Sequence, residues 1–227
     1  MSRFIAISYL FKLDKEKKEN LLPIDRKFNL ASNFDDSILF FSKPSQIFLL
    51  KIGEDKLNQL TDLEQPYPDF NFDDFSSFKK NLYFFDKKAG QIIKYLYPGN
   101  FQWEKPEFWL KKSLIGKSIA VDGSIWVLEK DNSINRYYAG NLEEKIEPDI
   151  FPFPKDFSKI FTSPYIPYLY ILEPSQKRII ILSKAGQIIK QFQSEKFDNL
   201  LDFGVSKDGK TIWLLNDSKV YKITLIS

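Results

Sequence analysis

The sequence predicts an all-β protein, a β-propeller built from about five antiparallel blades of 43–44 residues each. Three observations lead to this fold class. A short apolar phrase recurs at a nearly constant spacing, a second apolar stretch follows every copy across a polar turn, and no segment keeps a 3.6-residue period over three helical turns. A β-sandwich or another β-repeat is the alternative that the same pattern allows.

The recurring phrase is an apolar run that ends in a polar residue, and it begins at residues 37, 81, 124, 168 and 211. Successive copies are therefore 43 or 44 residues apart, which five independent apolar runs would rarely produce. β-branched and aromatic residues are frequent in each copy, so each is expected to form a strand. Apolar residues on both faces are typical of a strand that is buried between neighbouring blades. The copies are SILFFS (37–42), NLYFFD (81–86), SIWVLE (124–129), YLYILE (168–173) and TIWLLN (211–216).

Further strands flank each phrase. A short turn and a second apolar strand follow it, at 46–52, 91–97, 133–138, 178–182 and 219–225. Another strand precedes it, at 30–34, 75–78, 118–121, 159–162 and 201–205, and Asp-Gly pairs at 122–123 and 208–209 suit the tight turns between them. A fourth, more variable strand is expected at 57–63 and 187–192.

The units are expected to form one propeller domain over residues 1–227, with blades at about 29–72, 73–115, 116–156, 157–199 and 200–227. The last unit offers three strands, and an unpaired apolar edge is an aggregation hazard that closure of the ring removes. Residues 3–13 have the length and apolar content of a closing strand. One hypothesis pairs residues 4–12 with residues 219–225 in a five-bladed ring. The other places residues 3–24 in a truncated sixth blade.

The hairpin YLYILEPSQKRIIIL at residues 168–182 resembles a blade of the NHL and related six-bladed β-propellers. More closely, residues from about 80 to 225 resemble the C-terminal propeller of membrane-tethered, protein-phosphatase-like proteins from uncultured bacterial lineages. The shared features are blade phrases and not catalytic motifs, so the resemblance implies a bacterial propeller and no particular activity. The sequence departs from those proteins because it carries no phosphatase region and no membrane helix. We expect either a fragment or a freestanding propeller.

Composition excludes several kinds of chemistry. The 227 residues contain no Cys and no His, which removes disulfides, thiol nucleophiles, the usual zinc sites and imidazole catalysis. Glycine-rich phosphate loops and the EF-hand pattern are also missing from the sequence. With 33 Lys and Arg against 30 Asp and Glu, the formal charge of +3 gives little reason to expect nucleic acid or anionic membrane as a partner. We therefore predict no enzymatic activity, no catalytic residue, no metal and no cofactor.

Adjacent acids could in principle serve acid–base or cation chemistry, and they occur at Asp35-Asp36, Asp73-Asp74 and Glu143-Glu144. Each pair falls in a segment that is typical of an inter-strand loop, so solvated loops are expected instead. The enzymatic alternative is a propeller hydrolase or lactonase with a divalent cation in its central channel. It would need ligands from equivalent positions of the innermost strands. The candidates are Asn33, Ser76, Ser118, Lys159 and Asp202, a weak set for a hard cation.

Lysine-rich stretches at 15–18, 79–80 and 87–88 raise RNA binding as a further alternative, because NHL-type propellers can use one face for RNA. Interleaved acids argue against it. Lys87 and Lys88 also fall in a hairpin turn, where exposed lysine improves solubility and limits edge pairing.

Two of the four tryptophans are predicted core residues: Trp126 and Trp213 occupy the same phrase position as Leu39, Tyr83 and Tyr170. Trp103 and Trp109 lie outside the phrases, in residues 101–110, and are the candidate binding residues, because loops often carry recognition residues. The alternative is that this loop folds back onto the blade edge.

The predicted function is a non-enzymatic binding, scaffolding or sensory module that recognises a protein or glycan partner through its inter-blade loops. We expect a monomer. The apolar residues 4–11 are too short to span a bilayer and no small-residue cleavage site follows them, so neither a signal peptide nor a transmembrane helix is predicted. The compartment is left open.

Overall fold

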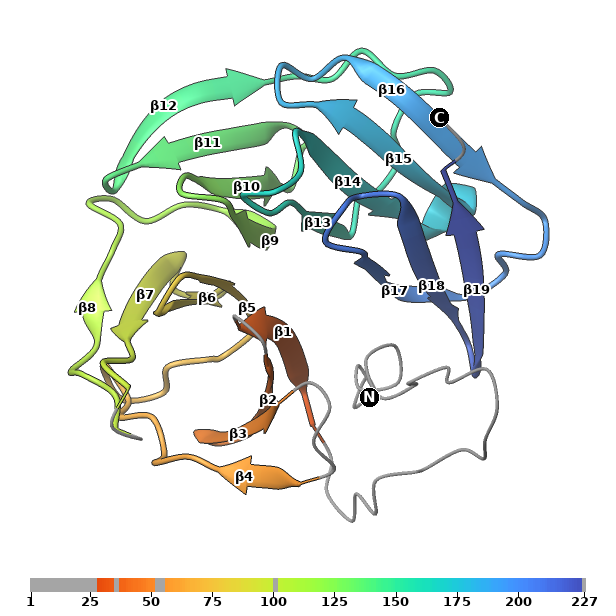
Figure 1. Ribbon diagram of the computed structural model, residues 1–227. Helices are drawn as coiled ribbons and strands as arrows, with labels where there is room; N and C mark the ends of the chain where they lie inside the picture. Colours follow the sequence, from red (N-terminus) through yellow and green to blue (C-terminus); the bar gives the residue numbers. More distant parts are fainter. Residues whose placement is uncertain (1–27, 35–36, 52–55, 100–101, 226–227) are drawn as a thin grey trace.

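The computed structural model describes residues 28–34, 37–51, 56–99 and 102–225. In this part, five antiparallel sheets stand in a ring around a central axis (Figure 1). The protein is a five-bladed β-propeller, which confirms the predicted fold class. The two hypotheses for residues 3–24, a closing strand or a partial sixth blade, concern residues outside this description, as does Asp35-Asp36.

The strands of each blade follow one another outward from the axis, in the order of the sequence (Figure 1). Blade 1 contains β1 (Leu30–Phe34), β2 (Ser37–Ser42), β3 (Gln46–Lys51) and β4 (Leu57–Gln59). Blade 2 contains β5 (Asp74–Phe78), β6 (Asn81–Asp86), β7 (Gln91–Leu96) and β8 (Glu107–Phe108). Blade 3 contains β9 (Gly116–Val121), β10 (Ile125–Glu129), β11 (Ile134–Tyr138) and β12 (Asn141–Ile146).

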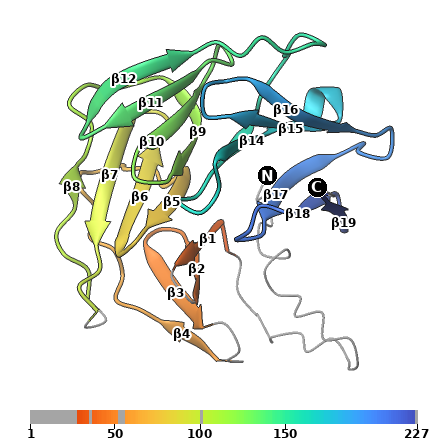
Figure 2. The ribbon, with the colours of Figure 1, turned by 45° about the horizontal axis from the view of Figure 1, so that its top comes forward.

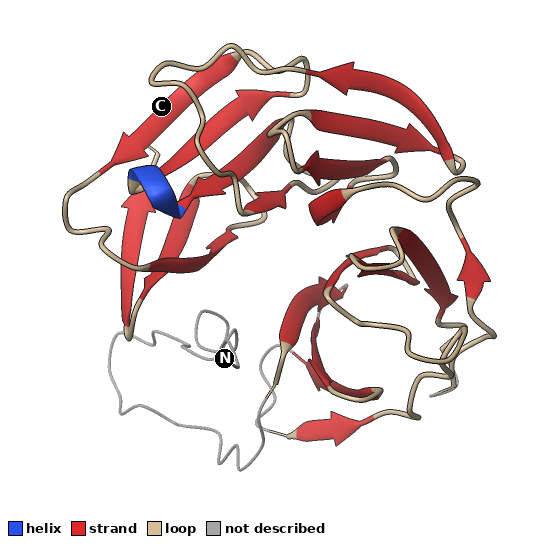
Figure 3. Ribbon diagram, turned by 180° about the vertical axis from the view of Figure 1, so that it is seen from behind, coloured by secondary structure: helices blue, strands red, loops and turns tan. Residues whose placement is uncertain are grey.

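The remaining two blades complete the described ring. Blade 4 contains β13 (Lys159–Phe161), β14 (Tyr168–Glu173), β15 (Arg178–Ser183) and β16 (Ile188–Gln193), and blade 5 contains β17 (Leu200–Val205), β18 (Thr211–Asn216) and β19 (Lys219–Thr224). The tilted view shows the twist of the sheets (Figure 2). Within the described residues, one 3-10 turn, η1 (Pro174–Gln176), connects β14 to β15 in blade 4 (Figure 3). Of the residues described, none belongs to a helix with the length and apolarity needed to cross a membrane.

The second strand of each blade coincides with the repeated phrase, so the repeat located a mostly buried strand in every sheet. The fourth strands β4 and β16 were also expected, whereas β8 and β12 were not. β12 reads NLEEKI and exposes all but its last residue, because an outermost strand has one paired edge and little core to cover. Glu143 and Glu144 therefore lie in a strand and not in a loop, and Arg136 Nε contacts Glu144 Oε2 at 3.2 Å.

The blades pack face to face through four apolar clusters, one at each junction from blade 1 to blade 5. The phrase position predicted as core is buried in four blades, at Leu39, Tyr83, Trp126 and Tyr170. Trp213, the fifth, is only half-buried. Ile212 and Leu214 on either side of Trp213 pack in the cluster shared with blade 4. Alternate residues of a strand face opposite sides of the sheet, so Trp213 points away from blade 4. In blades 1 to 4 the equivalent residue faces the next blade along the chain.

Candidate functional site

One residue from each blade forms a ring at one end of the central channel. Pairing between the first and second strands defines the equivalence, because the five ring residues face Phe41, Phe85, Leu128, Leu172 and Leu215 in register. The ring residues are Leu30, Asp74, Ser118, Lys159 and Asp202.

This ring corrects the set that the sequence suggested. Ser118, Lys159 and Asp202 were placed correctly, but Asp74 stands where Ser76 was expected, and Leu30 stands where Asn33 was expected. The blade spacing carried the missing signal, because residues 74 and 30 lie one and two steps of 44 residues before Ser118. Asp74 is 8% exposed, so the expectation of a solvated loop for this acid was also wrong.

Asp74 fastens blade 2 to blade 3. Its Oδ2 accepts hydrogen bonds from the Ser118 hydroxyl (2.7 Å) and from the N–H of Ile119 (2.9 Å), and its Oδ1 accepts one from the N–H of Phe75 (3.0 Å). The Ser118 hydroxyl oxygen in turn accepts a hydrogen bond from the N–H of Ile160 in blade 4 (3.3 Å). One carboxylate and one hydroxyl thus join three innermost strands.

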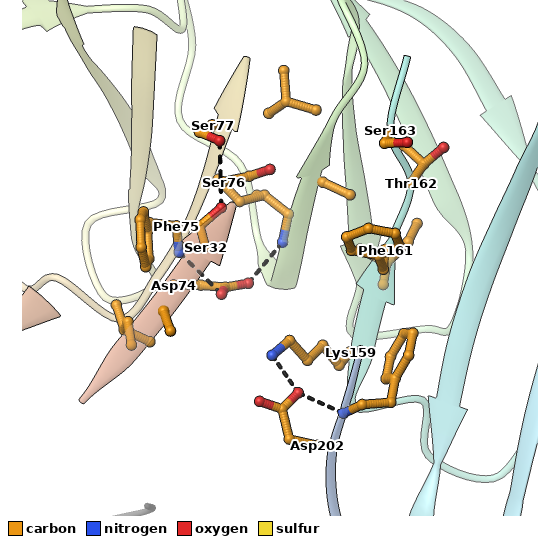
Figure 4. Close-up of a pocket in the computed structure, with 17 residues that line it drawn as sticks. Ser32, Asp74, Phe75, Ser76, Ser77, Lys159, Phe161, Thr162, Ser163 and Asp202 are labelled. Atoms are coloured by element: carbon orange, nitrogen blue, oxygen red, sulfur yellow. Dashed lines mark hydrogen bonds and ion pairs between the residues drawn. The ribbon is translucent and has the colours of Figure 1, made fainter. Parts of the chain in front are cut away.

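Lys159 and Asp202 fasten blade 4 to blade 5. The Lys159 ammonium donates to Asp202 Oδ1, which also accepts a hydrogen bond from the N–H of Phe203 (Figure 4). The Asp202 side chain is 10% exposed. Both acids of the ring are therefore committed to joining blades.

The ring is a poor cation site. It offers two carboxylates, an ammonium, a hydroxyl and an apolar side chain, whereas a hard divalent cation takes six or more oxygen ligands. Across the described ranges, no three His, Cys, Asp or Glu side chains are grouped so that they could hold a metal ion. A Lys159 ammonium in the same ring would also repel a divalent cation.

The channel holds a pocket of about 90 Å³ that all five innermost strands line, and Leu30, Asp74, Lys159 and Asp202 of the ring belong to its lining. Serine hydroxyls of blades 1 and 2 lie on one side, and Phe161, Thr162 and Ser163 of blade 4 lie on the other (Figure 4). Ser32 Oγ donates to Ser77 Oγ at 3.5 Å. Hydroxyl groups thus make up most of the polar lining of the pocket, and Phe75, Phe161 and Phe203 are the aromatic residues that line it.

A second repeated feature lies at the end of the second strand in three blades. There a buried polar side chain accepts hydrogen bonds from the segment that leads into the same blade. The residues are Asp86, Glu173 and Asn216 in blades 2, 4 and 5. Asp86 Oδ2, for example, accepts from the Tyr67 hydroxyl and from the N–H of Asn71, each at 3.0 Å. Burial, reinforced by this contact with the Asp86 carboxylate, raises the pKa of Tyr67.

These hydrogen bonds are most numerous in blade 4, where they hold residues 149–158, here called the anchored segment. Glu173 Oε1 accepts hydrogen bonds from the N–H groups of Lys155 (2.6 Å) and Asp156 (3.3 Å), and Glu173 Oε2 pairs with Arg178. Three consecutive carbonyls of the segment also accept hydrogen bonds from side chains of blade 4. The donors are Gln191 to Phe151 O (3.0 Å), Arg178 to Pro152 O (2.7 Å) and Gln176 to Phe153 O (2.7 Å).

The anchored segment exposes two aromatic side chains although its backbone is fixed. Phe151 is 77% exposed and Phe153 is 74% exposed, and their ring centroids lie 6.3 Å apart. No feature of the sequence phrases pointed to these residues, because the segment lies between repeats. Its alternation of Phe and Pro, FPFP at 151–154, was the available signal.

Trp103 and Trp109, the candidates from sequence, both lie against blade edges. Trp103 packs on Tyr97 with ring centroids 4.9 Å apart, and Trp109 meets Tyr83 edge-on at 6.1 Å. Both side chains are half-buried. The structure thus places them in packing contacts, and their role in binding stays a prediction.

The lysine pairs do not form a common patch. Lys79 and Lys80 precede β6, whereas Lys87 and Lys88 follow it, so the two pairs lie at opposite ends of one strand. All four are exposed turn residues. The stretch at 15–18 lies outside the part that the structure describes.

Comparison with known proteins supports the fold and identifies no family. No family model matches the chain, and no curated protein matches it. Among solved structures, a streptogramin B lyase matches with a TM-score of 0.51 and 15% identity, over 87% of this chain and 68% of that one. The glutaminyl cyclase of Myxococcus xanthus matches with a TM-score of 0.58 and 9% identity, over 88% of this chain and 91% of that one.

A third solved structure, a structural genomics protein of unknown function from Bacteroides thetaiotaomicron, matches with a TM-score of 0.59 and 12% identity, over 88% of this chain and 56% of that one. What these proteins share with the chain is the propeller. At such identities the likeness carries no information about activity.

Proposed function

We propose that the chain is a non-enzymatic binding module that recognises a protein partner through the anchored segment. The observation that carries this proposal is the exposure of Phe151 and Phe153 on a backbone that blade 4 holds in place. Exposed apolar side chains are costly in water and effective in an interface. The resemblance to NHL-type propellers and to the propellers of phosphatase-like proteins supports a recognition or sensory role within a larger assembly.

The fixed backbone is what makes the two rings useful for binding. Ordering a loop on association costs free energy, and a segment that is already ordered avoids this cost. Arg178, whose side chain is 1% exposed, holds the carbonyl between the two phenylalanines. The backbone that carries Phe151 and Phe153 is therefore held in place before a partner binds.

The neighbouring strand adds one contact to the anchored segment, from Gln191 of β16 to the Phe151 carbonyl. Ile189, two residues earlier, is 49% exposed and lies where the pairing of β16 with β15 shifts register, so strand alternation does not place it beside the segment. Full burial of a phenylalanine side chain contributes roughly 1.5–3 kcal/mol, so Phe151 and Phe153 together can dominate a small interface.

The chemistry of this surface favours a protein over the other partner classes. Phenylalanine side chains offer no hydrogen bonds to sugar hydroxyls or bases, and the exposed lysine pairs lie in the turns at the two ends of β6. Aromatic anchors are typical of protein–protein contacts. The propeller hydrolase or lactonase remains the alternative from a different class, and the ring around the channel gives it no suitable ligand set.

The proposal is tested by selecting peptides from a phage-displayed library on the wild-type chain, with counter-selection on F151S/F153S. We expect peptides that bind the wild type and lose at least about tenfold in affinity on F151S/F153S. Tyr165→Ser is the matched control, because Tyr165 is 67% exposed and belongs to a different loop. Selected peptides that bind F151S/F153S and the wild type equally well would overturn the proposal.

The non-enzymatic part has its own test. The wild-type chain is assayed with esters, lactones and phosphoesters in the presence of Ca²⁺ and Mg²⁺. We expect no turnover above that of heat-denatured protein. Turnover that Asp202→Asn abolishes would support the enzymatic alternative instead.

A further inference from the structure

We infer that the central channel binds a small, neutral, polyhydroxylated ligand, a sugar or polyol, between the serines of blades 1 and 2 and Phe161 of blade 4. This is separate from the proposed protein-binding surface, which lies on the anchored segment at the outside of blade 4. The cavity of about 90 Å³ is several times the roughly 10–15 Å³ that one water molecule needs, so it suits a small ligand.

Hydroxyl groups dominate the polar lining of this pocket. Ser76, Ser77 and Ser32 lie on one side and Ser163 on the other (Figure 4). Within the described ranges, the hydroxyls of Ser76 and Ser163 have no hydrogen-bond partner in the protein. Each hydroxyl can both donate and accept, as can each hydroxyl of a sugar, so the two sets are complementary.

Phe161 supplies an aromatic side chain to the site, which Phe75 and Phe203 also line. Its side chain lines the pocket and is half-buried, and Tyr170 and Phe203 hold it edge-on with ring centroids 6.3 and 6.2 Å away. The C–H groups on one face of a sugar ring are apolar and pack on an aromatic face. A polyol thus finds hydroxyls on one side and a fixed ring on the other.

The charges around the pocket favour a neutral ligand. Lys159 and Asp202 neutralise each other, and Asp74 already accepts three hydrogen bonds from its own neighbourhood. A charged ligand would give up its hydration without gaining an uncommitted counter-charge. A neutral ligand needs only the hydroxyls.

The test is saturation-transfer NMR followed by isothermal titration calorimetry. The probes are D-glucose, D-galactose, D-mannose and myo-inositol, with D-glucosamine and D-glucuronate as the cationic and anionic comparisons. We expect at least one neutral probe to bind saturably and more tightly than its charged relatives. Ser76→Ala and Ser163→Ala should each weaken binding about 2- to 10-fold, the effect of one hydrogen bond.

Two further variants keep the result interpretable. Phe161→Leu retains an apolar side chain for the core and should weaken the same probe about 2- to 10-fold, while Ser218→Ala, in the exposed turn between β18 and β19, should leave binding unchanged. Circular dichroism confirms that each variant is folded. The inference is overturned if no neutral probe saturates at millimolar concentration, if a charged relative binds more tightly, or if Ser76→Ala and Ser163→Ala bind as the wild type does.

Discussion

Arg178 and Glu173 form an ion pair in which Nε and Oε2 are 2.6 Å apart and the two side chains are 1% and 0% exposed. The pair links the ends of β14 and β15, and each partner also holds main-chain groups of the anchored segment. A buried pair of this kind is costly to assemble but even more costly to break on one side. Here its geometry determines where Phe151 and Phe153 stand.

Replacing Arg178 with methionine tests this link between core and surface. Glu173 would stay buried without its counter-charge, so we expect a loss of about 3–5 kcal/mol in the free energy of unfolding. Denaturation in urea measures it. Lys177→Met is the matched control, because Lys177 pairs with Glu195 at the surface and should cost less than about 1 kcal/mol. Equal losses in the two variants would contradict the assignment.

The bond between Asp74 and Ser118 predicts coupling between blades 2 and 3. Ser118→Ala removes one donor from a buried carboxylate and an acceptor from the N–H of Ile160, so it should cost about 1–3 kcal/mol. Asp74→Asn should cost a similar amount, and the double variant should lose less than the sum. Ser76→Ala removes a hydroxyl that has no hydrogen-bond partner among the described residues, so it should stay within about 0.5 kcal/mol of the wild type. Additive losses would show that the two residues act independently.

Tyr170 predicts a pH dependence at the alkaline end. Its hydroxyl donates to Gly209 O in blade 5 (3.1 Å), and burial raises the pKa of Tyr170 to about 12. The unfolded chain loses this proton near pH 10, so the stability that Tyr170 contributes is complete below pH 10 and declines as the pH rises towards 12.

Tyr170→Phe should therefore lower stability by about 0.5–1.5 kcal/mol at neutral pH and flatten the decline between pH 10 and 12. Urea titrations at a series of pH values measure both effects. Tyr138→Phe, at a side chain 58% exposed, is the control. An unchanged alkaline slope in Tyr170→Phe would mean that this tyrosine ionises equally well in the folded state.

The two phrase tryptophans should respond differently. Trp126 is 3% exposed and packs between blades 3 and 4, so Trp126→Ala should cost about 3–5 kcal/mol. Trp213 is half-buried, so Trp213→Ala should cost clearly less, roughly 1–2 kcal/mol. Chemical denaturation of both variants measures the loss in the free energy of unfolding. A larger loss for Trp213→Ala than for Trp126→Ala would show that a further part of the chain covers Trp213.

The propeller could be predicted because its blades repeat. Burial on both faces makes the second strand continuously apolar, so the phrases at 37–42 and 168–173 stand out from their surroundings. The outermost strands could not be predicted in the same way. β12 has an exposed face and an unpaired edge, and its Glu143 and Glu144 have the composition of a loop.

The site residues were harder to predict because they depend on register. Asp74 follows Asp73 in an apparently polar connection, and only its pairing opposite Phe85 places it in the channel ring. Phe151 and Phe153 have no equivalents in the other blades, so the repeat could not indicate them. Their exposure depends on Arg178, which lies 26 residues after Pro152, and on Gln191, which lies 40 residues after Phe151.

The measurement that tests the central claim most directly is hydroxyl-radical footprinting of the chain with and without a saturating selected peptide. The reaction reports the exposure of individual aromatic side chains. Phe151 and Phe153 should lose most of their reactivity in the complex, while Phe108, which is 59% exposed in blade 2, should keep its own. Full reactivity of Phe151 and Phe153 in a saturated complex would contradict the claim that the anchored segment is the binding surface.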